Sequence, residues 1–444
     1  MSNQTSFSSV AKAPAWERVF VILVMITCCR GFDSLFALGN SGGQNALNDS
    51  SPARFTWLAI LYGTAVLLLL VHHVRDLPKL LVQNKLLLVV VAYIVASTFW
   101  SVDPPTALRR SMAFALTTTF CLYLVLRFPP TDILRLAAWA LFCVAIASVI
   151  AALFVPELGR EMYGRKLGWW KGVCSINTSF GRFMALGMLV VWCLRRANWG
   201  LQRYDVLVLG LFALCTFQAQ AATSFAAVFG AFVSIVVVWS RTPFDAPLPA
   251  KLAVGALFAA VLVLTLPFYS SEVFDILQRD DTLTNRIFIW SAAYEQGWLN
   301  PVFGVGYESF WIESNAAGAF FNMFGSGNTI IGNGHNGYLD AWLELGFVGL
   351  ACLAALLIQA FIRVTRYGLK HDDPMAQFYG GLLVFILIYS IAEKAIFVHS
   401  EITWLLFTTG LVATKWRLAG PEAAASRMQA PPDVIDGSIR RGSL

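Results

Sequence analysis

The segment 132–155 decides the fold class of this chain. Its core reads Leu136-Ala-Ala-Trp-Ala-Leu-Phe-Cys-Val-Ala-Ile-Ala-Ser-Val-Ile-Ala-Ala-Leu-Phe-Val155 and contains no charged side chain. About 20 apolar residues in a helix are long enough to cross the hydrocarbon core of a bilayer. The sequence therefore predicts a transmembrane helix here.

Similar apolar runs recur along the whole chain. Those before 200 lie at about 18–38, 55–73, 86–100, 111–127, 132–155 and 178–195, and the later ones at about 205–220, 223–240, 252–270, 337–362, 378–398 and 402–417. The first run has no small-residue cleavage site, which favours an uncleaved anchor over a signal peptide. We therefore predict an all-α polytopic integral membrane protein with about twelve transmembrane helices.

The composition supports this class. Of the 444 residues, 57% are hydrophobic and only 13% are charged, whereas soluble domains have about 25% charged residues. The eight cysteines show no CxxC and no Cys/His metal spacing, and most lie within the apolar runs, so we interpret them as small buried apolar residues. We predict a single transmembrane domain over 1–417.

Basic residues in the short loops predict the orientation. They gather in the turns after every second run: Arg75, Lys79 and Lys85; Arg127 and Arg135; Arg195, Arg196 and Arg203; Arg241 and Lys251; Arg363, Arg366 and Lys370. These turns, and both termini, are expected in the cytoplasm. The tail 418–444 is rich in Ala, Pro, Ser and Gly, which is typical of a disordered segment.

The opposite face then holds two unusual loops. The loop 156–177 has an excess of basic residues on the side where they are normally scarce. The loop 271–336 is long and contains several aromatic residues and three pairs of glycines. Long loops of this kind are usually functional. We expect one or two short helices within it, one of them around 283–297.

His335 is the candidate general base in the long loop. It lies in Gly332-Asn-Gly-His-Asn-Gly337, where the loop meets a predicted span. Histidine exchanges protons near neutral pH without a perturbed environment, and a loop at a helix mouth suits a base. The alternative is a polar helix-capping cluster with Asn336 as the cap.

Several cations are expected on the same face. Arg182 lies about one turn inside its span, where an arginine is expensive unless it faces a polar cavity, binds an anion or extends to the interface. Arg286 could instead form a surface ion pair with Asp280 or Asp281. Together with Arg165, Lys166 and Lys171, these residues suit a phosphate or diphosphate.

Other charged groups have simpler interpretations. Arg30/Asp33 and Glu393/Lys394 are spaced as ion pairs that would hold the bundle. Asp340 and Glu344 lie on one helical face, and Glu344 could assist a base but more simply has a structural role. Asp280-Asp281 is too small a set to predict a metal site. Nucleotide-binding, zinc-hydrolase and serine-hydrolase motifs are absent from the sequence, so we expect no cofactor, and no feature suggests a nucleic-acid partner.

Five segments resemble the O-antigen ligase / O-antigen polymerase superfamily. They are His335-Asn-Gly-Tyr-Leu-Asp-Ala-Trp-Leu-Glu344-Leu-Gly346-Phe-Val-Gly349-Leu, the loop segments Thr282-Leu-Thr-Asn-Arg286-Ile-Phe-Ile-Trp290 and Pro301-Val-Phe-Gly304-Val-Gly306-Tyr307-Glu-Ser-Phe310-Trp311, the turn Trp100-Ser-Val-Asp-Pro-Pro-Thr-Ala-Leu-Arg109-Arg110, and the segment from Trp170 through Asn177 to Arg182. Their order matches over roughly 85–360. The loop and the turn are most similar to exopolysaccharide polymerases of the ExoQ type.

The resemblance implies a GT-C-like, metal-independent membrane glycosyltransferase in the bacterial inner membrane, with a periplasmic active face. Its donor would be an undecaprenyl-diphosphate-linked oligosaccharide and its acceptor a glycan or a lipid A-core. Arginines would hold the diphosphate, and His335 would assist the attacking hydroxyl. Tyr307, Trp290, Asn177 and Asn336 join the expected substrate-binding residues. Membrane lipids and other polysaccharide assembly proteins are the expected partners.

The chain departs from the family pattern at two places. It has Ser175-Ile176-Asn177 where such proteins often have His-Lys-Asn, and Ala221-Ala222-Thr223-Ser224 where many have a basic residue. One diphosphate contact is therefore missing or moved to Lys171 or Arg182.

Three functions remain open from the sequence. A polymerase and a ligase differ only in their acceptor, which the sequence does not show. A lipid-linked glycan flippase is the alternative from another class. Transporters often have two similar halves, and no such repeat is visible here; the ionisable residues gather at one face, which favours an enzyme.

Overall fold

The fold is all-helical. The computed structural model describes residues 13–33, 52–162, 166–174, 176–197, 204–239, 280–312, 333–371 and 374–416, and within these ranges it contains no strand, only an isolated bridge between Arg160 and Trp170. The predicted span 252–270, the tail 418–444 and Arg165 lie outside the described residues.

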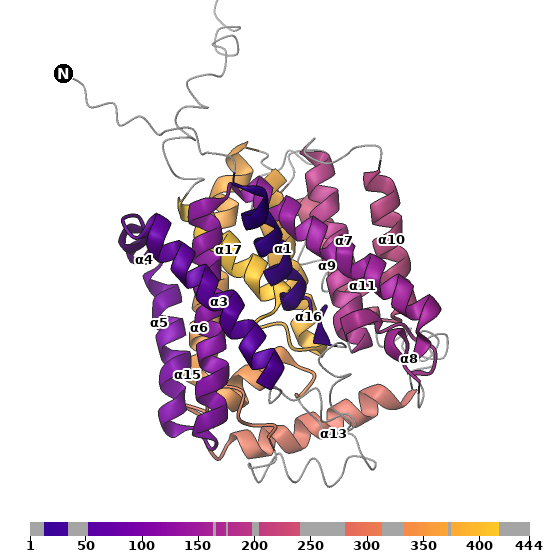
Figure 1. Cartoon of the computed structure of the whole chain (residues 1–444). Helices are drawn as coiled ribbons and strands as arrows, with labels where there is room; N and C mark the ends of the chain where they lie inside the picture. The colour runs from indigo at the N-terminus through magenta and orange to yellow at the C-terminus, as the bar shows by residue number, and fades with distance from the viewer. Residues whose placement is uncertain are drawn as a thin grey trace, which may run out of the picture.

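The helices follow the predicted apolar runs closely. The first half of the chain forms α1 Ala15–Cys28, α3 Pro52–His73, α4 Leu77–Gln83, α5 Lys85–Ala96, η2 Ser97–Trp100, α6 Pro104–Arg127, α7 Pro130–Phe154, α8 Pro156–Gly159, η4 Gly172–Cys174 and α9 Asn177–Arg196. The second half forms α10 Asp205–Gln218, α11 Ala222–Ser234, η5 Ile235–Trp239, α13 Asp280–Gly297, α15 Gly337–His371, α16 Pro374–Ala392 and α17 Ile402–Trp416 (Figure 1).

Six helices of the described part are long and apolar enough to cross a membrane, and a seventh arises if the pair Leu77–Gln83 and Lys85–Trp100, bent by 88°, counts as one span. The chain is therefore a polytopic helical membrane protein. α1, α10 and α17 follow predicted runs but have only 14, 14 and 15 residues. The number twelve stays a prediction.

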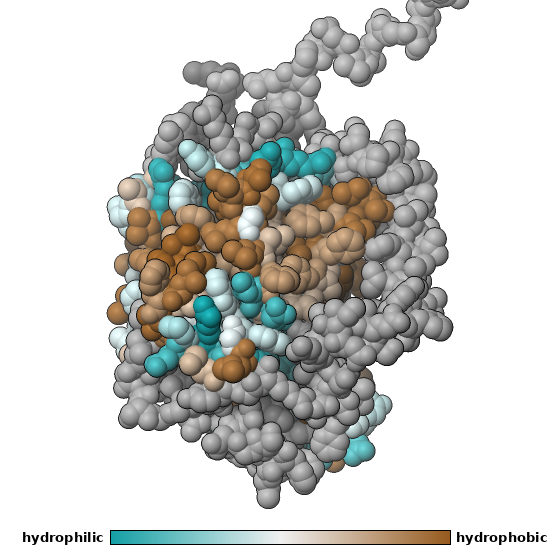
Figure 2. Space-filling model, turned by 90° about the vertical axis from the view of Figure 1, so that its right-hand side faces the viewer, coloured by the Kyte–Doolittle hydropathy of each residue, from teal (hydrophilic) through white to brown (hydrophobic). Residues whose placement is uncertain are grey.

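The helices differ in how much of their surface faces outward. In α9 and α16, 83% and 72% of the apolar window is buried inside the protein, against 22% in α3 and 33% in α15. α9 and α16 therefore form the centre of the bundle, and α3 and α15 lie at its periphery. Figure 2 shows a band of hydrophobic residues across the described surface, with hydrophilic residues above and below it. This is the pattern expected of a membrane protein whose central surface band contacts the hydrocarbon core of the bilayer.

Residues predicted to share the cytoplasmic end lie together. Arg127 at the end of α6 binds Glu17 at the start of α1, with Nη2 and Oε2 2.7 Å apart. Arg363 of α15 donates to Asn84 Oδ1 at 2.9 Å, and Lys415 of α17 donates to the Gln83 carbonyl at 2.7 Å. The predicted alternation of turns is thus consistent with the packing of these helix ends.

Two helices depart from the predicted runs at the other end. α16 stops at Ala392, whereas the apolar run continued to 398, and residues 393–401 form an irregular segment with positive φ at Phe397 and Ser400. α15 is broken at Gly346, where φ is 66°. Both departures bring backbone and charged side chains to the end of the helix bundle that α13 crosses (Figure 1). We call this end the mouth of the bundle.

Candidate active site

Three irregular segments meet at the mouth of the bundle: 301–311 after α13, 333–336 before α15, and 393–401 between α16 and α17. The segment 301–311 contacts α15 at the break at Gly346. Val305 N donates to the Leu343 carbonyl at 3.1 Å, and Phe347 N donates to the Pro301 carbonyl at 2.8 Å. These bonds satisfy backbone groups that the break at Gly346 would otherwise leave without partners.

His335 forms a pair with Glu393. Its Nδ1 lies 3.2 Å from Glu393 Oε2; the histidine side chain is 39% exposed, whereas that of Glu393 is 8% exposed. A buried carboxylate on one ring nitrogen holds the ring in one orientation, which is how an orienting acid assists a histidine base. His335 also has a positive φ of 49°, and strained backbone of this kind clusters at functional sites.

Asn336 is the N-cap of α15. Its Oδ1 accepts from the backbone N–H groups of Tyr338 at 3.0 Å and Leu339 at 3.1 Å, the bonds that a capping side chain makes. The capping interpretation of this loop therefore holds for Asn336. His335 instead points to a carboxylate 58 residues further along the chain.

A second charged group surrounds Glu308. Its carboxylate lies 3.2 Å from His399 Nδ1, 3.6 Å from Lys394 Nζ and 3.7 Å from Arg110 Nε. Burial alone would raise the pKa of Glu308, but His399, Lys394 and Arg110 together lower it below the ordinary value. Lys394 also binds Glu344 at 2.7 Å. This group therefore keeps a carboxylate ionised beside the His335 pair.

Glu393 and Lys394 do not serve mainly as the ion pair that the sequence suggested. The structure pairs Glu393 with His335 and Lys394 with Glu344 and Glu308. Adjacent residues in an irregular segment point to different neighbours, so three contacts with other segments replace the one expected. The predicted Arg30/Asp33 pair is also replaced by a different contact, because Asp33 Oδ1 lies 3.7 Å from Arg54 Nη2.

Arg182 is buried beneath the 393–401 segment. Its side chain is 5% exposed, and its guanidinium donates to the Lys394 carbonyl at 2.7 Å and lies 3.5 Å from Glu401. The rings of Phe183 and Tyr389 lie 5.2 and 5.1 Å from it. In this conformation Arg182 supports the segment that presents Glu393 and Lys394, and a direct contact with an anion stays a prediction.

The basic loop 156–177 is attached to the neighbouring turn. Lys166 is exposed and its Nζ donates to Asn177 Oδ1 at 3.2 Å, while Asn177 Nδ2 donates to the Ala219 carbonyl at 3.1 Å. Lys171 is half-buried. Within the described residues, no hydrogen bond or ion pair joins these three side chains to the His335 pair.

Trp290 and Tyr307 support the two loops. Trp290 Nε1 donates to the Gly334 carbonyl at 2.7 Å, which ties α13 to the segment before His335. Tyr307 is fully buried and donates to the Phe397 carbonyl at 2.5 Å. It is therefore not positioned to stack on a sugar in this conformation. Arg286 lies on α13, as predicted for a helix in this loop, but its side chain is outside the described residues.

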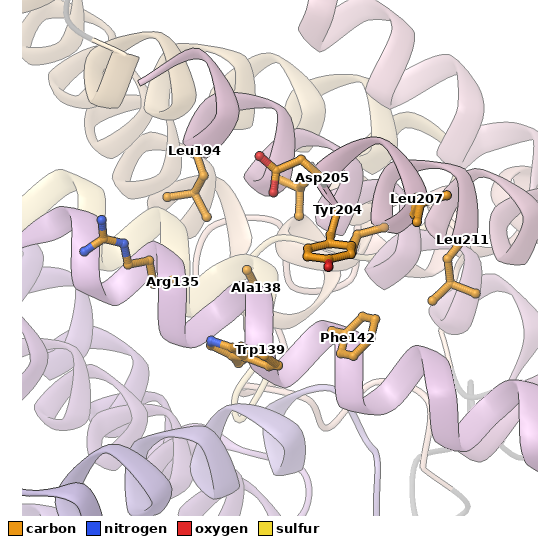
Figure 3. Close-up of a pocket in the computed structure, with 11 residues that line it drawn as sticks. Arg135, Ala138, Trp139, Phe142, Leu194, Tyr204, Asp205, Leu207 and Leu211 are labelled. Carbon is orange, nitrogen blue, oxygen red and sulfur yellow. The ribbon is translucent and has the colours of Figure 1, made fainter. Parts of the chain in front are cut away.

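An apolar groove of about 560 Å³ lies away from these groups, between α7, α9 and α10. Figure 3 shows Trp139 and Phe142 of α7 facing Leu207 and Leu211 of α10, and Tyr204 just before α10, across it. It contains none of the candidate site residues and only two charged side chains, Arg135 and Asp205. Its lining is almost entirely apolar, which does not suit a glycan or a diphosphate.

No group of three or more potential metal ligands occurs within the described ranges. The side chains of Asp280 and Asp281 lie outside them. The charges that the structure does gather at the mouth are Arg, Lys and His side chains with buried carboxylates, so electrostatic assistance from amino-acid side chains is available there.

Comparisons with known proteins agree with the motifs. Residues 206–354 match the O-antigen ligase family model, a range that includes α13, the described loop segments and His335. Over 384 residues the chain is 26% identical to the exopolysaccharide production protein ExoQ of Rhizobium meliloti (strain 1021), covering 81% of this chain and 84% of that protein. The resemblance predicted from the motifs is confirmed: this polytopic membrane protein is similar to the O-antigen ligase family and, over most of its length, to ExoQ.

Proposed function

We propose that this chain is a membrane glycosyltransferase that polymerises exopolysaccharide or O-antigen repeat units from an undecaprenyl-diphosphate-linked donor. The observation that carries this proposal is the pair of an accessible His335 and a buried Glu393 at the mouth of the bundle. The similarity to ExoQ and to the O-antigen ligase family supports polysaccharide as the class of product.

His335 acts as the general base in this proposal. A sugar hydroxyl of the acceptor attacks the anomeric carbon of the donor; the new glycosidic bond forms as the bond to the diphosphate oxygen breaks. The hydroxyl proton passes to His335, and Glu393 stabilises the resulting imidazolium. Positioned general bases typically accelerate such steps about 10²–10⁴-fold. The lipid diphosphate leaves as an anion, so no general acid is required.

Cationic side chains hold the leaving diphosphate. Arg286, Arg182, Lys171, Lys166 and Arg165 are the proposed contacts, in the arrangement that the sequence suggested. Lys394, Arg110 and His399 gather around Glu308, and Lys394 is adjacent in the chain to the Glu393 that contacts His335. Preorganised charges of this kind stabilise developing negative charge without a metal, so the reaction is proposed to be metal-independent and to need no cofactor.

The test is a reconstituted reaction. The purified protein in proteoliposomes, given a lipid-diphosphate-linked repeat unit, should form a ladder of longer lipid-linked glycans in excess chelator. Activity that is lost in chelator and restored by magnesium or manganese would show that a metal, and not the side chains, neutralises the diphosphate.

Two alternatives are separable in the same assay. A ligase would transfer glycan to an added lipid A-core acceptor and leave the donor unextended in its absence. A flippase would change the side of the membrane on which the donor is found without forming a glycosidic bond. The charged groups at one mouth of the bundle favour transfer over transport, because a transporter needs such groups along its whole crossing.

The proposed setting is the bacterial inner membrane. We propose twelve spans in one GT-C-like unit over 1–417, with both termini cytoplasmic and the His335 face periplasmic. The clustering of Glu17, Arg127, Arg363 and Lys415 contacts at one end supports the segregation of the two faces.

A further inference from the structure

A compact group of aromatic side chains lies where α13 meets α15. Tyr294, Trp298, Trp342 and Phe347 pack with ring centroids 5.5 to 5.9 Å apart. Trp100 lies 5.8 Å from Phe303 in the adjoining loop. We call these six residues the aromatic belt.

Most of the belt and its connecting loop are exposed, although they are strongly apolar; Trp342 is the exception, at 6% exposed. Leu299 is 71% exposed, Phe303 54%, Trp298 51% and Phe347 46%. Neighbouring Phe99 is 90% exposed. Contiguous exposed patches of this kind mark surfaces that contact a partner or a membrane.

The break at Gly346 divides α15 into a polar and an apolar part. Asp340 and Glu344 precede it, and the stretch 347–366 that follows has no acidic residue. At 1.5 Å per residue this stretch is about 30 Å long, the thickness of the hydrocarbon core. The boundary of the membrane on the His335 side is therefore expected near Phe347.

The neighbouring helices α5 and η2 place the membrane boundary at the same depth. Asn84, just before α5, contacts Arg363 at the other end of the bundle. From there, residues 85–100 rise about 24 Å, and residues 347–363 of α15 cover about 26 Å. Trp100 Nε1 donates to the Phe303 carbonyl at 3.2 Å. Trp100, Phe303 and Phe347 thus lie at one depth.

We propose that the aromatic belt is an interfacial anchor that embeds α13 and its following loop in the lipid headgroup region on the His335 side. Tryptophan and tyrosine favour this region because they combine an apolar ring with a polar group. The belt is continuous with outward-facing apolar side chains of the adjoining spans, such as Ile358, which is 59% exposed, and Val89, which is 58% exposed. Lipid that covers these side chains also covers the belt.

The anchor fixes the position of the candidate site along the membrane normal. Trp290, on the same helix as Tyr294, holds the Gly334 carbonyl next to His335. The belt therefore sets α13, and through it the His335 loop, at the level of the headgroups. This surface role does not depend on which reaction the site performs.

Nitroxide labels in phospholipid vesicles test the anchor directly. A label at Leu299→Cys is compared with one at Ile358→Cys, which faces lipid, and with one at Gln296→Cys, which is exposed on the opposite side of α13 from Tyr294. All three are placed in a Cys143→Ser chain, because Cys143 is the exposed cysteine in the described part. The label at position 299 should collide more often with oxygen than with a water-soluble nickel chelate, and so should the label at 358. The label at 296 should show the reverse.

Two results would overturn the proposal. A label at 299 that behaves like the one at 296 would place the belt in water. A label that neither reagent reaches would mean that a protein, such as a second copy of the chain, covers the belt. Phe303→Cys places a label on a residue of the belt itself, so the outcome does not rest on the loop position 299 alone.

Discussion

At the scale of single residues, the orientation of His335 depends on Glu393. Replacing Glu393 by Gln keeps a hydrogen-bonding group 3.2 Å from the ring but removes the negative charge that stabilises the imidazolium. We predict that turnover falls roughly 10- to 100-fold, part of the effect expected for losing the base itself. Donor binding should persist.

Glu295→Gln is the matched control, since Glu295 is an exposed carboxylate on α13. It should leave turnover unchanged. Equal turnover in the two variants, or a loss of donor binding in Glu393→Gln, would mean that Glu393 only supports the fold.

Glu308 should make stability depend on acid pH. Its cationic neighbours lower its pKa in the folded protein, so its contribution is present above the ordinary value for a glutamate and is lost as pH falls through the folded pKa. Between about pH 7 and about pH 3, the wild type should therefore lose more thermal stability than Glu308→Gln. Melting curves in detergent measure the difference; identical pH dependences would contradict the role of this carboxylate.

The sequence singled out His335 as the candidate base but did not identify Glu393 as its partner. His335 stood out because only one side chain with its proton affinity occurs in the long loop. Glu393 is 58 residues away and adjacent to a lysine, so sequence proximity favoured the wrong pair. Glu308 and His399 had no comparable signal in the sequence, because this group comes from three separate segments that only the fold brings together: α6 with Arg110, the loop with Glu308, and the segment with Lys394 and His399.

At the scale of elements, the break in α15 depends on Gly346. Its φ of 66° is a left-handed conformation, and a Cβ there would overlap the Val302 carbonyl. Gly346→Ala should therefore destabilise the protein by roughly 2 kcal/mol or more. Gly63→Ala on α3 is the control, because a Cβ at Gly63 meets nothing within 4 Å. Melting temperatures in detergent compare them, and equal values would show that the break tolerates a side chain.

Apolar periodicity predicted where helices lie better than where they end. The run 132–155 became α7 with almost the same limits, because it is a continuous apolar stretch that positive φ does not interrupt. The run 378–398 was too long, since Phe397 and Ser400 adopt positive φ to place Lys394 and His399 in the charged group. Hydropathy cannot detect an interruption that tertiary hydrogen bonds and ion pairs stabilise.

At the scale of the whole molecule, the two faces should be distinguishable by labelling. We predict that cysteines at Trp290 and Arg427 are modified from opposite sides of the membrane, because one lies in the proposed periplasmic loop and the other in the tail. Whole cells with an impermeant maleimide provide the measurement. Labelling of both positions from the same side would contradict the predicted alternation of turns.

The central claim is that His335 is the base of glycosyl transfer, and its replacement tests the claim most directly. In proteoliposomes with a lipid-diphosphate-linked donor, His335→Ala should lower turnover about 10²-fold or more while donor binding survives. His72→Ala, at an exposed histidine of α3, should behave like the wild type. If His335→Ala also turns over like the wild type, the histidine only shapes the loop, and the base must be one of the carboxylates.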